Sequence, residues 1–216
     1  MIYQRHMPRE ELVAAQLEML MQNGRLAAVS VHLVGVVATM VMFWPYMQVP
    51  TLLLWAAGFL IFLLVRSLHM TSALVERRQL TRPVRLYWQL LAGAAVTGAV
   101  WSAGYISALC VIPSTMQQVF LLMIVMIAAF SLGFSVAIRE YYLVYIFASL
   151  WPVAWWTLVH YWDRPYNAII GLSLLAFIVL LIYVCDQTYK SLRNMISLAW
   201  EREHTAQELG DLTVSL

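Results

Sequence analysis

Among the ionisable side chains of this sequence, a histidine lies deepest within an apolar run. His32 lies about two helical turns inside that run, where an imidazole could bind a metal ion or a haem iron. Such a ligand needs a second histidine at similar depth, and we expect His69 and His160 near opposite membrane faces. The other interpretation is a neutral imidazole bonded to a neighbouring Ser, Thr or backbone carbonyl, because polar side chains often join membrane helices. We expect neither a metal nor another cofactor.

A set of aromatic residues could form a pocket for a hydrophobic ligand. Trp151 and Trp155 can share one face of a helix, and Pro152 would kink that helix and free a backbone carbonyl. With Trp101 and Tyr105 of another apolar run, this face predicts an apolar pocket open to the outer leaflet. The alternative is an aromatic belt at the membrane interface. The complete predicted pocket consists of His32, Trp101, Tyr105, Trp151, Pro152 and Trp155.

Groups for catalysis or ion coupling are missing from the apolar runs. No run contains an Asp, Glu, Lys or Arg in its interior, and the sequence has no His-Glu-x-x-His, Gly-x-Ser-x-Gly or glycine-rich phosphate loop. Ion-coupled transporters, proton pumps and intramembrane enzymes usually keep ionisable groups at mid-membrane. We therefore predict no catalytic residue and disfavour these classes.

The composition explains why so few ionisable side chains lie within the apolar runs. The chain has 216 residues, 62% of them apolar and 11% charged, with a mean hydropathy of +0.76, whereas a soluble domain is about half apolar and a quarter charged. The apolar residues form runs of about 20, the length that crosses a bilayer as a helix. These features predict an all-α protein, a six-helix transmembrane bundle. Its predicted spans are 26–43, 51–65, 86–112, 116–138, 141–159 and 166–185.

A lead helix precedes the membrane domain, which covers residues 25–186. In residues 1–24, Leu12 and Met19 share one face with other apolar residues, and Gly24 is typical of a helix end. We therefore predict a cytosolic amphipathic helix that ends at Gly24, and the alternative is a partly ordered tail.

The last span continues into residues 187–216. No proline or glycine lies between Gly171 and Gly210, so a single helix can leave the membrane as a polar signalling helix. Apolar residues follow a 3-4 spacing past the membrane, which predicts a short coiled-coil seam in a homodimer. An ordinary solvated helix end is the alternative. The seam positions are Tyr189, Leu192, Ile196 and Ala199.

The basic residues indicate the orientation. Six spans put both termini on one side, and 12 of the 13 Lys and Arg residues lie on that side, with only Arg164 in an opposite turn. By the positive-inside rule that side is the cytosol. We therefore expect a multi-pass protein of the bacterial cytoplasmic (inner) membrane, N-in and C-in, with the lipid bilayer and no nucleic acid as its partner.

Four segments resemble a known type of protein. They are Glu-Glu-Leu-Val-Ala-Ala-Gln-Leu-Glu-Met-Leu at 10–20, Phe-Trp-Pro-Tyr at 43–46, Gly-Ala-Val-Trp-Ser-Ala-Gly at 98–104 after an Arg-rich loop, and Leu-Ala-Trp-Glu-Arg-Glu-His at 198–204. Together they are similar to the six-span N-terminal input modules of bacterial membrane diguanylate cyclases (GGDEF proteins) and of sensor or hybrid histidine kinases. The resemblance implies a dimeric sensory domain with a cytosolic enzyme beyond Leu216.

The chain itself departs from that pattern. It contains no GGDEF, histidine kinase or receiver sequence, so the domain either belongs to a longer protein or acts alone by binding another protein. We expect a sensory or regulatory module that responds to a hydrophobic small molecule or another membrane signal and passes it through span six. The alternatives are a small six-span transporter or channel, which needs a polar path, and a membrane adaptor acting by protein-protein contact.

Overall fold

The structure is a computed structural model that describes residues 7–160 and 165–214, with side chains over 7–159 and 168–207. All regular elements in this part of the chain are α-helices. Six helices are long and apolar enough to cross a membrane. These findings confirm the predicted all-α, six-span architecture of a multi-pass membrane protein.

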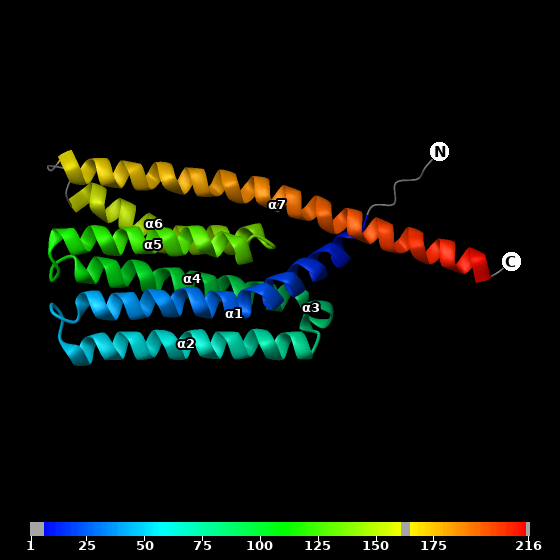
Figure 1. Cartoon of the computed structure of the whole chain (residues 1–216), viewed down its shortest axis with the longest axis horizontal. Helices are drawn as coiled ribbons and strands as arrows, with labels where there is room; N and C mark the ends of the chain where they lie inside the picture. The colour runs from blue at the N-terminus through cyan, green and yellow to red at the C-terminus, as the bar shows by residue number, and fades with distance from the viewer. Residues whose placement is uncertain (1–6, 161–164, 215–216) are drawn as a thin grey trace.

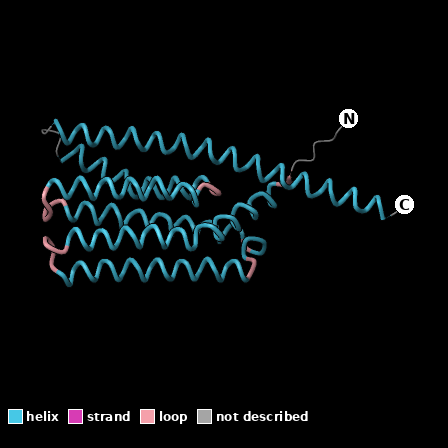
Figure 2. The backbone as a smooth tube through the Cα atoms, viewed as in Figure 1, coloured by secondary structure: helices cyan, strands magenta, loops and turns pink. Residues whose placement is uncertain are grey.

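The six long helices run along a common direction and are joined by short turns (Figures 1 and 2). We call the end with the turns at 44–48 and 109–113 the apical end, and the end with the turns at 76–82 and 136–138 the basal end. Helix α1 begins and helix α7 ends beyond the basal end (Figure 1). The helices are α1 (Arg9–Phe43), α2 (Val49–Val75), α3 (Arg78–Thr81), α4 (Pro83–Ala108), α5 (Ser114–Ser135), α6 (Arg139–His160) and α7 (Pro165–Val214).

Helix α1 contradicts the prediction of a separate lead helix ending at Gly24. It is one helix of 35 residues, and no glycine in the described chain has a positive φ. A single glycine costs a helix only about 1 kcal/mol relative to alanine. The side chains of Leu17, Leu20 and Met21 are fully buried just before it, and their burial outweighs that cost. The basal part of α1 bends away from the bundle toward α7 (Figure 1).

Other span limits also differ from the predicted ones. Helix α4 ends at Ala108 rather than at 112, because the Gln117 side-chain amide donates hydrogen bonds to the carbonyls of Leu109 (2.8 Å) and Ile112 (3.0 Å) and holds the apical turn. Helix α5 ends at Ser135 rather than at 138. Helix α2 continues to Val75, past the predicted membrane span 51–65, as expected for a stretch that prolongs this span as a helix.

Helix α6 lies between α4 and α7. One glycine sets the distance between α6 and α4, and another sets the distance between α6 and α7. A Cβ atom on Gly98 would lie 2.6 Å from the carbonyl oxygen of Tyr145 and 2.8 Å from Cβ of Ala148, so the backbones of α4 and α6 are in contact. A Cβ atom on Gly171 of α7 would lie 2.7 Å from Cγ of Leu158. Small residues allow this close approach in membrane helix bundles.

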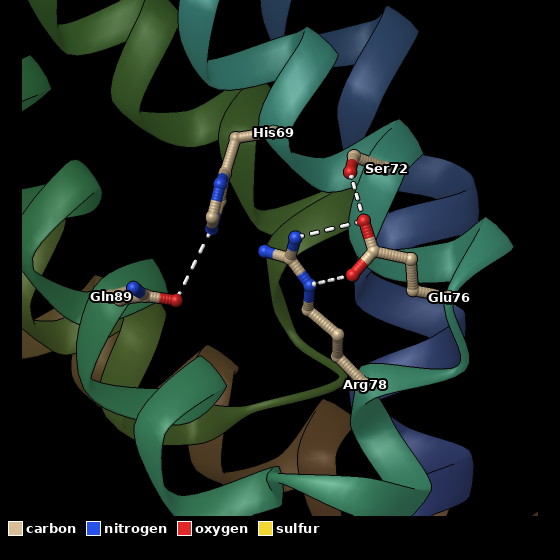
Figure 3. Close-up of polar contacts among 5 residues, drawn as sticks. All are labelled: His69, Ser72, Glu76, Arg78 and Gln89. Carbon is tan, nitrogen blue, oxygen red and sulfur yellow. Dashed lines mark hydrogen bonds and ion pairs between the residues drawn. The ribbon is translucent and has the colours of Figure 1, made fainter.

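A polar network holds the arginine-rich turn between α2 and α4 (Figure 3). The Glu76 carboxylate accepts bonds from Arg78 at 2.7 and 2.9 Å and from the Ser72 hydroxyl at 2.8 Å. These bonds, first of all the one from Arg78, hold the pKa of Glu76 below its usual value. Nearby, Nε2 of His69 lies 3.2 Å from Oε1 of Gln89 and joins α2 to α4.

Candidate functional site

Three of the six predicted pocket residues lie together in the bundle core. His32, Trp101 and Tyr105 are all buried, with Trp101 fully so. The indole Nε1 of Trp101 donates a hydrogen bond to Nδ1 of His32 at 3.0 Å. An indole N–H can only donate, so Nδ1 carries no proton and His32 is a neutral imidazole. The neutral interpretation of His32 therefore fits this geometry, with an indole as the partner in place of the expected Ser, Thr or carbonyl.

Aromatic rings surround this pair. The His32 ring lies 5.9 Å from the Phe59 ring and 5.8 Å from the Tyr145 ring, and Trp101 lies 5.5 Å from Phe59 and 5.9 Å from Trp55. Such separations are typical of favourable aromatic pairs. The hydroxyl of Tyr145 is buried. We call these five residues, together with Tyr105, the aromatic core.

The other three predicted pocket residues lie elsewhere. Trp151 and Trp155 are 46% and 60% exposed, on the outer face of α6, and Trp151 is near the ring of Phe147. Pro152 lies inside α6, which continues as a helix on both sides of it. The structure therefore does not bring the α6 tryptophans to Trp101. Their exposure matches the alternative interpretation, rings that face lipid at a membrane interface.

An apolar cavity does exist in the apical half, but other residues form it. It has a volume of about 290 Å³ and lies between α1, α2, α4 and α5. Trp55 of the aromatic core lines this cavity, and a Cβ atom on Gly104 would lie 3.4 Å from Nε1 of Trp55. The hydroxyl residues Thr51 and Ser107 are exposed at its rim. The signal in the sequence was the run of small residues in α4, whose missing side chains leave this space open.

Arg66 lies in α2 just after the predicted span 51–65, and its side chain takes part in the packing of the bundle, which the sequence did not predict. It belongs to α2, about 26 Å along the helix from its apical start, and its side chain reaches into the bundle. Nη1 donates to the Thr97 hydroxyl at 2.8 Å, and the guanidinium lies 5.5 Å from the centre of the Tyr141 ring. Gly93 provides the space beside it, since a Cβ atom there would lie 3.2 Å from Nε.

The Arg66 charge has no acidic partner among the residues that the structure describes, and its buried Nε has no hydrogen-bond partner there. A buried cation without a counter-charge is costly in a protein interior and more so in a membrane. The sequence gives no sign of this contact, because Arg66 follows an apolar run and begins a stretch rich in arginine that we expect to continue the helix beyond the span. We interpret Arg66 as a second polar feature of the bundle, separate from the aromatic core.

The predicted seam of α7 is used partly within the chain itself. Tyr189 and Leu192 are half-buried and pack against the bundle core, Ile196 is half-buried, and Ala199 is exposed. Thus only the distal part of the predicted seam is available to a partner.

Polar contacts tie α7 to the basal end at two levels. Asp186 pairs with Lys190 at 2.6 Å and with Arg139, at the start of α6, at 3.4 Å. Farther along, Nε1 of Trp200 donates to the Glu11 carboxylate at 2.8 Å. The second contact joins the beginning of α1 to the part of α7 that lies outside the bundle, and nothing in the local sequence predicts it.

Comparison with protein families, with curated proteins and with solved structures finds no match. The functional argument therefore rests on the chain's own geometry. That geometry consists of an aromatic core around His32, an apical apolar cavity, a half-buried arginine and a helix that leaves the bundle.

Proposed function

We propose that the chain is a membrane sensory or regulatory module of a bacterial signalling protein, in which α7 passes a signal to a cytosolic diguanylate cyclase or histidine kinase domain. The observation that supports this proposal is α7, one helix of 50 residues. At 1.5 Å per residue it is about 75 Å long, whereas the hydrocarbon core is about 30 Å thick. A continuous helix of that length can carry a shift from one end to the other.

The contacts of α7 support such a role. Its buried positions begin at Gly171 and end at Cys185, and none of residues 186–207 is buried. The membrane half is held by α6, while the basal half contacts the rest of the chain through the half-buried Tyr189 and Leu192 and, farther out, through the Trp200–Glu11 hydrogen bond. Exposed polar contacts are weak in water, so small changes in the bundle can shift the basal half.

The proposal places the basal end in the cytosol, as the positive-inside rule requires. The basal turn between α2 and α4 contains Arg77, Arg78 and Arg82, and α7 carries Lys190 and Arg193 past the bundle. With the basal end inside, both termini are cytosolic and the apical cavity faces the outer leaflet of the inner membrane.

The apical cavity is the proposed place for a hydrophobic signal molecule. Its walls are mainly apolar, with hydroxyl groups at the rim, which is typical of small-molecule sites. A ligand there would contact Trp55, whose ring adjoins Trp101 of the aromatic core. From Trp101 the packing continues through Phe59 and His32 to Tyr145 of α6, the helix on which α7 packs.

Cysteine crosslinking in native membranes tests the proposal. Cys110 and Cys185 are first replaced by alanine, and single cysteines are then placed at Tyr189, Leu192, Ile196 and Ala199. A dimeric signalling helix predicts disulfide-linked dimers at these positions, strongest at Ile196→Cys and Ala199→Cys, which are farthest from the bundle. The control Met195→Cys, exposed beside the seam, should crosslink weakly. Absence of dimers at all four positions would contradict a dimeric sensor.

Arg66 gives a specific reason to keep a second candidate, a small transporter or channel for anions. A cation inside the bundle would attract an anion along its path. The test is chloride uptake into proteoliposomes. The control Arg85→Gln changes an exposed arginine in the first turn of α4. Uptake that is lost in Arg66→Gln and retained in Arg85→Gln would favour this candidate over the sensor.

A further inference from the structure

A polar pocket of about 410 Å³ lies at the basal end between α2 and α4, beside the network of Figure 3. We call it the α2–α4 pocket. Its walls come from the turn after α2, from α3 and from the first two turns of α4. The residues used below line it: Glu76, Arg78, Thr81, Arg82, Arg85 and Gln89.

The length of the two helices places this pocket among lipid headgroups. Helix α2 has 27 residues and α4 has 26, so at 1.5 Å per residue each is about 40 Å long. The hydrocarbon core of a bilayer is about 30 Å thick, and the bilayer with its headgroup regions is about 40–45 Å thick. Helices of this length that cross the core have their ends, and the pocket between those ends, in the headgroup region.

The surface next to the α2–α4 pocket is apolar. Val75, at the end of α2, is 78% exposed, and Val84 and Trp88 of α4, each beside a lining residue, are 69% and 63% exposed. Such side chains are suited to acyl chains, and tryptophan is enriched where the chains meet the headgroups. A molecule in the pocket therefore has an apolar surface beside it, as a lipid requires.

One guanidinium is held in place at the wall of the pocket. Nε and Nη2 of Arg78 donate to the Glu76 carboxylate, which also accepts from Ser72. Nη1 of Arg78 has no hydrogen-bond partner among residues 7–160 and 165–214, and it points away from Glu76 (Figure 3). Oε1 of Gln89 faces His69, so the amide N–H groups of Gln89 remain available. The wall thus presents N–H donors from side chains that other residues orient.

The charges leave the α2–α4 pocket positive. Arg82 and Arg85 are exposed at its rim, and Glu76 is the only carboxylate among the described residues that line it. Both oxygens of this carboxylate already accept bonds from Arg78, so the other two guanidinium groups are not neutralised by it. Guanidinium groups match the oxygens of a phosphate, and basic pockets between membrane helices suit anionic lipid headgroups.

We propose that the α2–α4 pocket binds the phosphate of an anionic phospholipid, such as phosphatidylglycerol, from the leaflet at the basal end. Arg82 and Arg85 pair with the phosphate oxygens, and Nη1 of Arg78 donates to the same group. The acyl chains lie along Val84 and Trp88. A soluble phosphate ester offers the same phosphate but no chains for this apolar surface, and phosphatidylcholine adds a cation beside three arginines.

This inference does not rest on the proposed function, because a channel or an adaptor with the same fold would hold the same pocket. The pocket contains no residue of α7. Loss of lipid binding would therefore leave the crosslinking of α7 unchanged, and either proposal can fail alone.

The test counts the lipids that stay bound to the whole chain. Native mass spectrometry of protein released from nanodiscs with equal amounts of phosphatidylcholine and phosphatidylglycerol gives the ratio of the two bound lipids. We expect preferential retention of phosphatidylglycerol. Arg82→Gln should lower this preference about tenfold, the usual loss for one hydrogen bond to a charged group. Thr81→Lys adds a cation to the lining and should raise the preference, a gain that misfolding cannot produce.

The matched control is Arg77→Gln, which removes an exposed arginine of the same turn that does not line the pocket. It should change the preference less than about twofold, because an exposed charge away from the phosphate is screened by salt. Equal retention of the two lipids by the unchanged chain, or equal losses in Arg77→Gln and Arg82→Gln, would overturn the site.

A second measurement separates the lipid from a soluble phosphate. Calorimetry with glycerol 3-phosphate in nanodiscs of pure phosphatidylcholine measures binding of the phosphate without acyl chains. We expect no binding. Binding that is lost in Arg82→Gln would show that the pocket takes a soluble phosphate ester and would overturn the lipid assignment.

Discussion

Helices α6 and α7 lie against each other and are both apolar, yet the chain holds them differently. One face of helix α6 is buried along its length, from Tyr141 to Thr157, and its backbone touches α4 at Gly98. Among residues 168–207 of α7, the buried positions lie between Gly171 and Cys185. Beyond them Tyr189 and Leu192 still pack on the bundle, and the contact of Trp200 with Glu11 is exposed and polar. The difference divides the molecule into two parts. One is the closely packed bundle around α4 and α6, which we call the frame, and the other is the part of α7 that leaves the bundle.

The division has a physical basis. Contacts between backbones cannot adjust without moving whole helices, because packed interiors are as dense as organic crystals. Exposed hydrogen bonds such as that of Trp200 to Glu11 exchange readily with water. Substitutions in the frame should therefore lower the free energy of unfolding. Substitutions at the basal end should alter the position of the exposed part of α7 with little loss of stability. The predictions that follow test this contrast from the largest effect to the smallest.

The largest effect is expected at the contact between α4 and α6. Gly98→Ala should reduce the free energy of unfolding by about 3 kcal/mol, because the new methyl group meets backbone atoms that cannot move aside. Unfolding of the purified protein in mixed detergent micelles measures the change. The control Gly133→Ala, at a glycine with no atom within 4 Å of a Cβ, should change stability by less than about 1 kcal/mol. Equal effects would mean that this contact is not tight.

The next effect is expected in the aromatic core. Trp101→Phe keeps an aromatic ring but removes the N–H that bonds His32, so an acceptor is left unpaired and a small void opens. Together these should cost about 2 kcal/mol. Trp88→Phe is the matched control, because Trp88 is on the same helix but 63% exposed, and it should cost less than about 0.5 kcal/mol. A loss of unfolding free energy no larger than that of the control would mean that the His32–Trp101 hydrogen bond contributes little to the stability of the bundle.

A smaller effect is expected at Arg66. Thr97→Val removes the hydroxyl that accepts from the guanidinium, and should cost about 1.5 kcal/mol. In an Arg66→Met background, where no guanidinium needs an acceptor, the same change should cost much less. A double-mutant cycle from four unfolding measurements gives the coupling energy. A coupling energy near zero would show that Arg66 draws no stability from Thr97.

The smallest effect is expected at the exposed turn between α2 and α4. The pKa of Glu76 is lowered by its bonds from Arg78 and Ser72, so its carboxylate stabilises the turn fully above the ordinary glutamate pKa of about 4.3. That contribution is lost as the pH falls through the lower, folded-state pKa. A spin label at Leu80→Cys should become more mobile only at such acid pH. In Glu76→Gln its mobility should not depend on pH, and an unchanged acid transition there would assign it to another group.

Several features of the fold could be predicted from the sequence. Six apolar runs of bilayer length require six helices, and an even number of spans puts both ends of the chain on one side. The absence of proline and glycine after Gly171 predicted the continuous α7, which runs on through Gly210 to Val214. These properties depend on the length and composition of segments, and a sequence records both directly.

The sequence could not predict in the same way which face of each helix packs inside the bundle and which face meets lipid. In water an apolar stripe marks the buried side of a helix, but in a membrane both lipid and protein interior accept apolar residues. Trp151 and Trp155 therefore looked as suitable for a pocket as Trp101, and only packing turned them outward. Arg66 follows the predicted span in the same way, and only packing brought its side chain to Thr97.

Composition and segment length thus determined by themselves that this chain is a six-helix membrane protein with one long helix leaving the bundle. Only the tertiary structure decided that His32 bonds Trp101, that Gly98 brings α4 onto α6, and that α1 reaches α7 through Glu11 and Trp200. The reason is that these contacts join residues between 47 and 189 positions apart, and no local pattern specifies which distant residue will lie opposite.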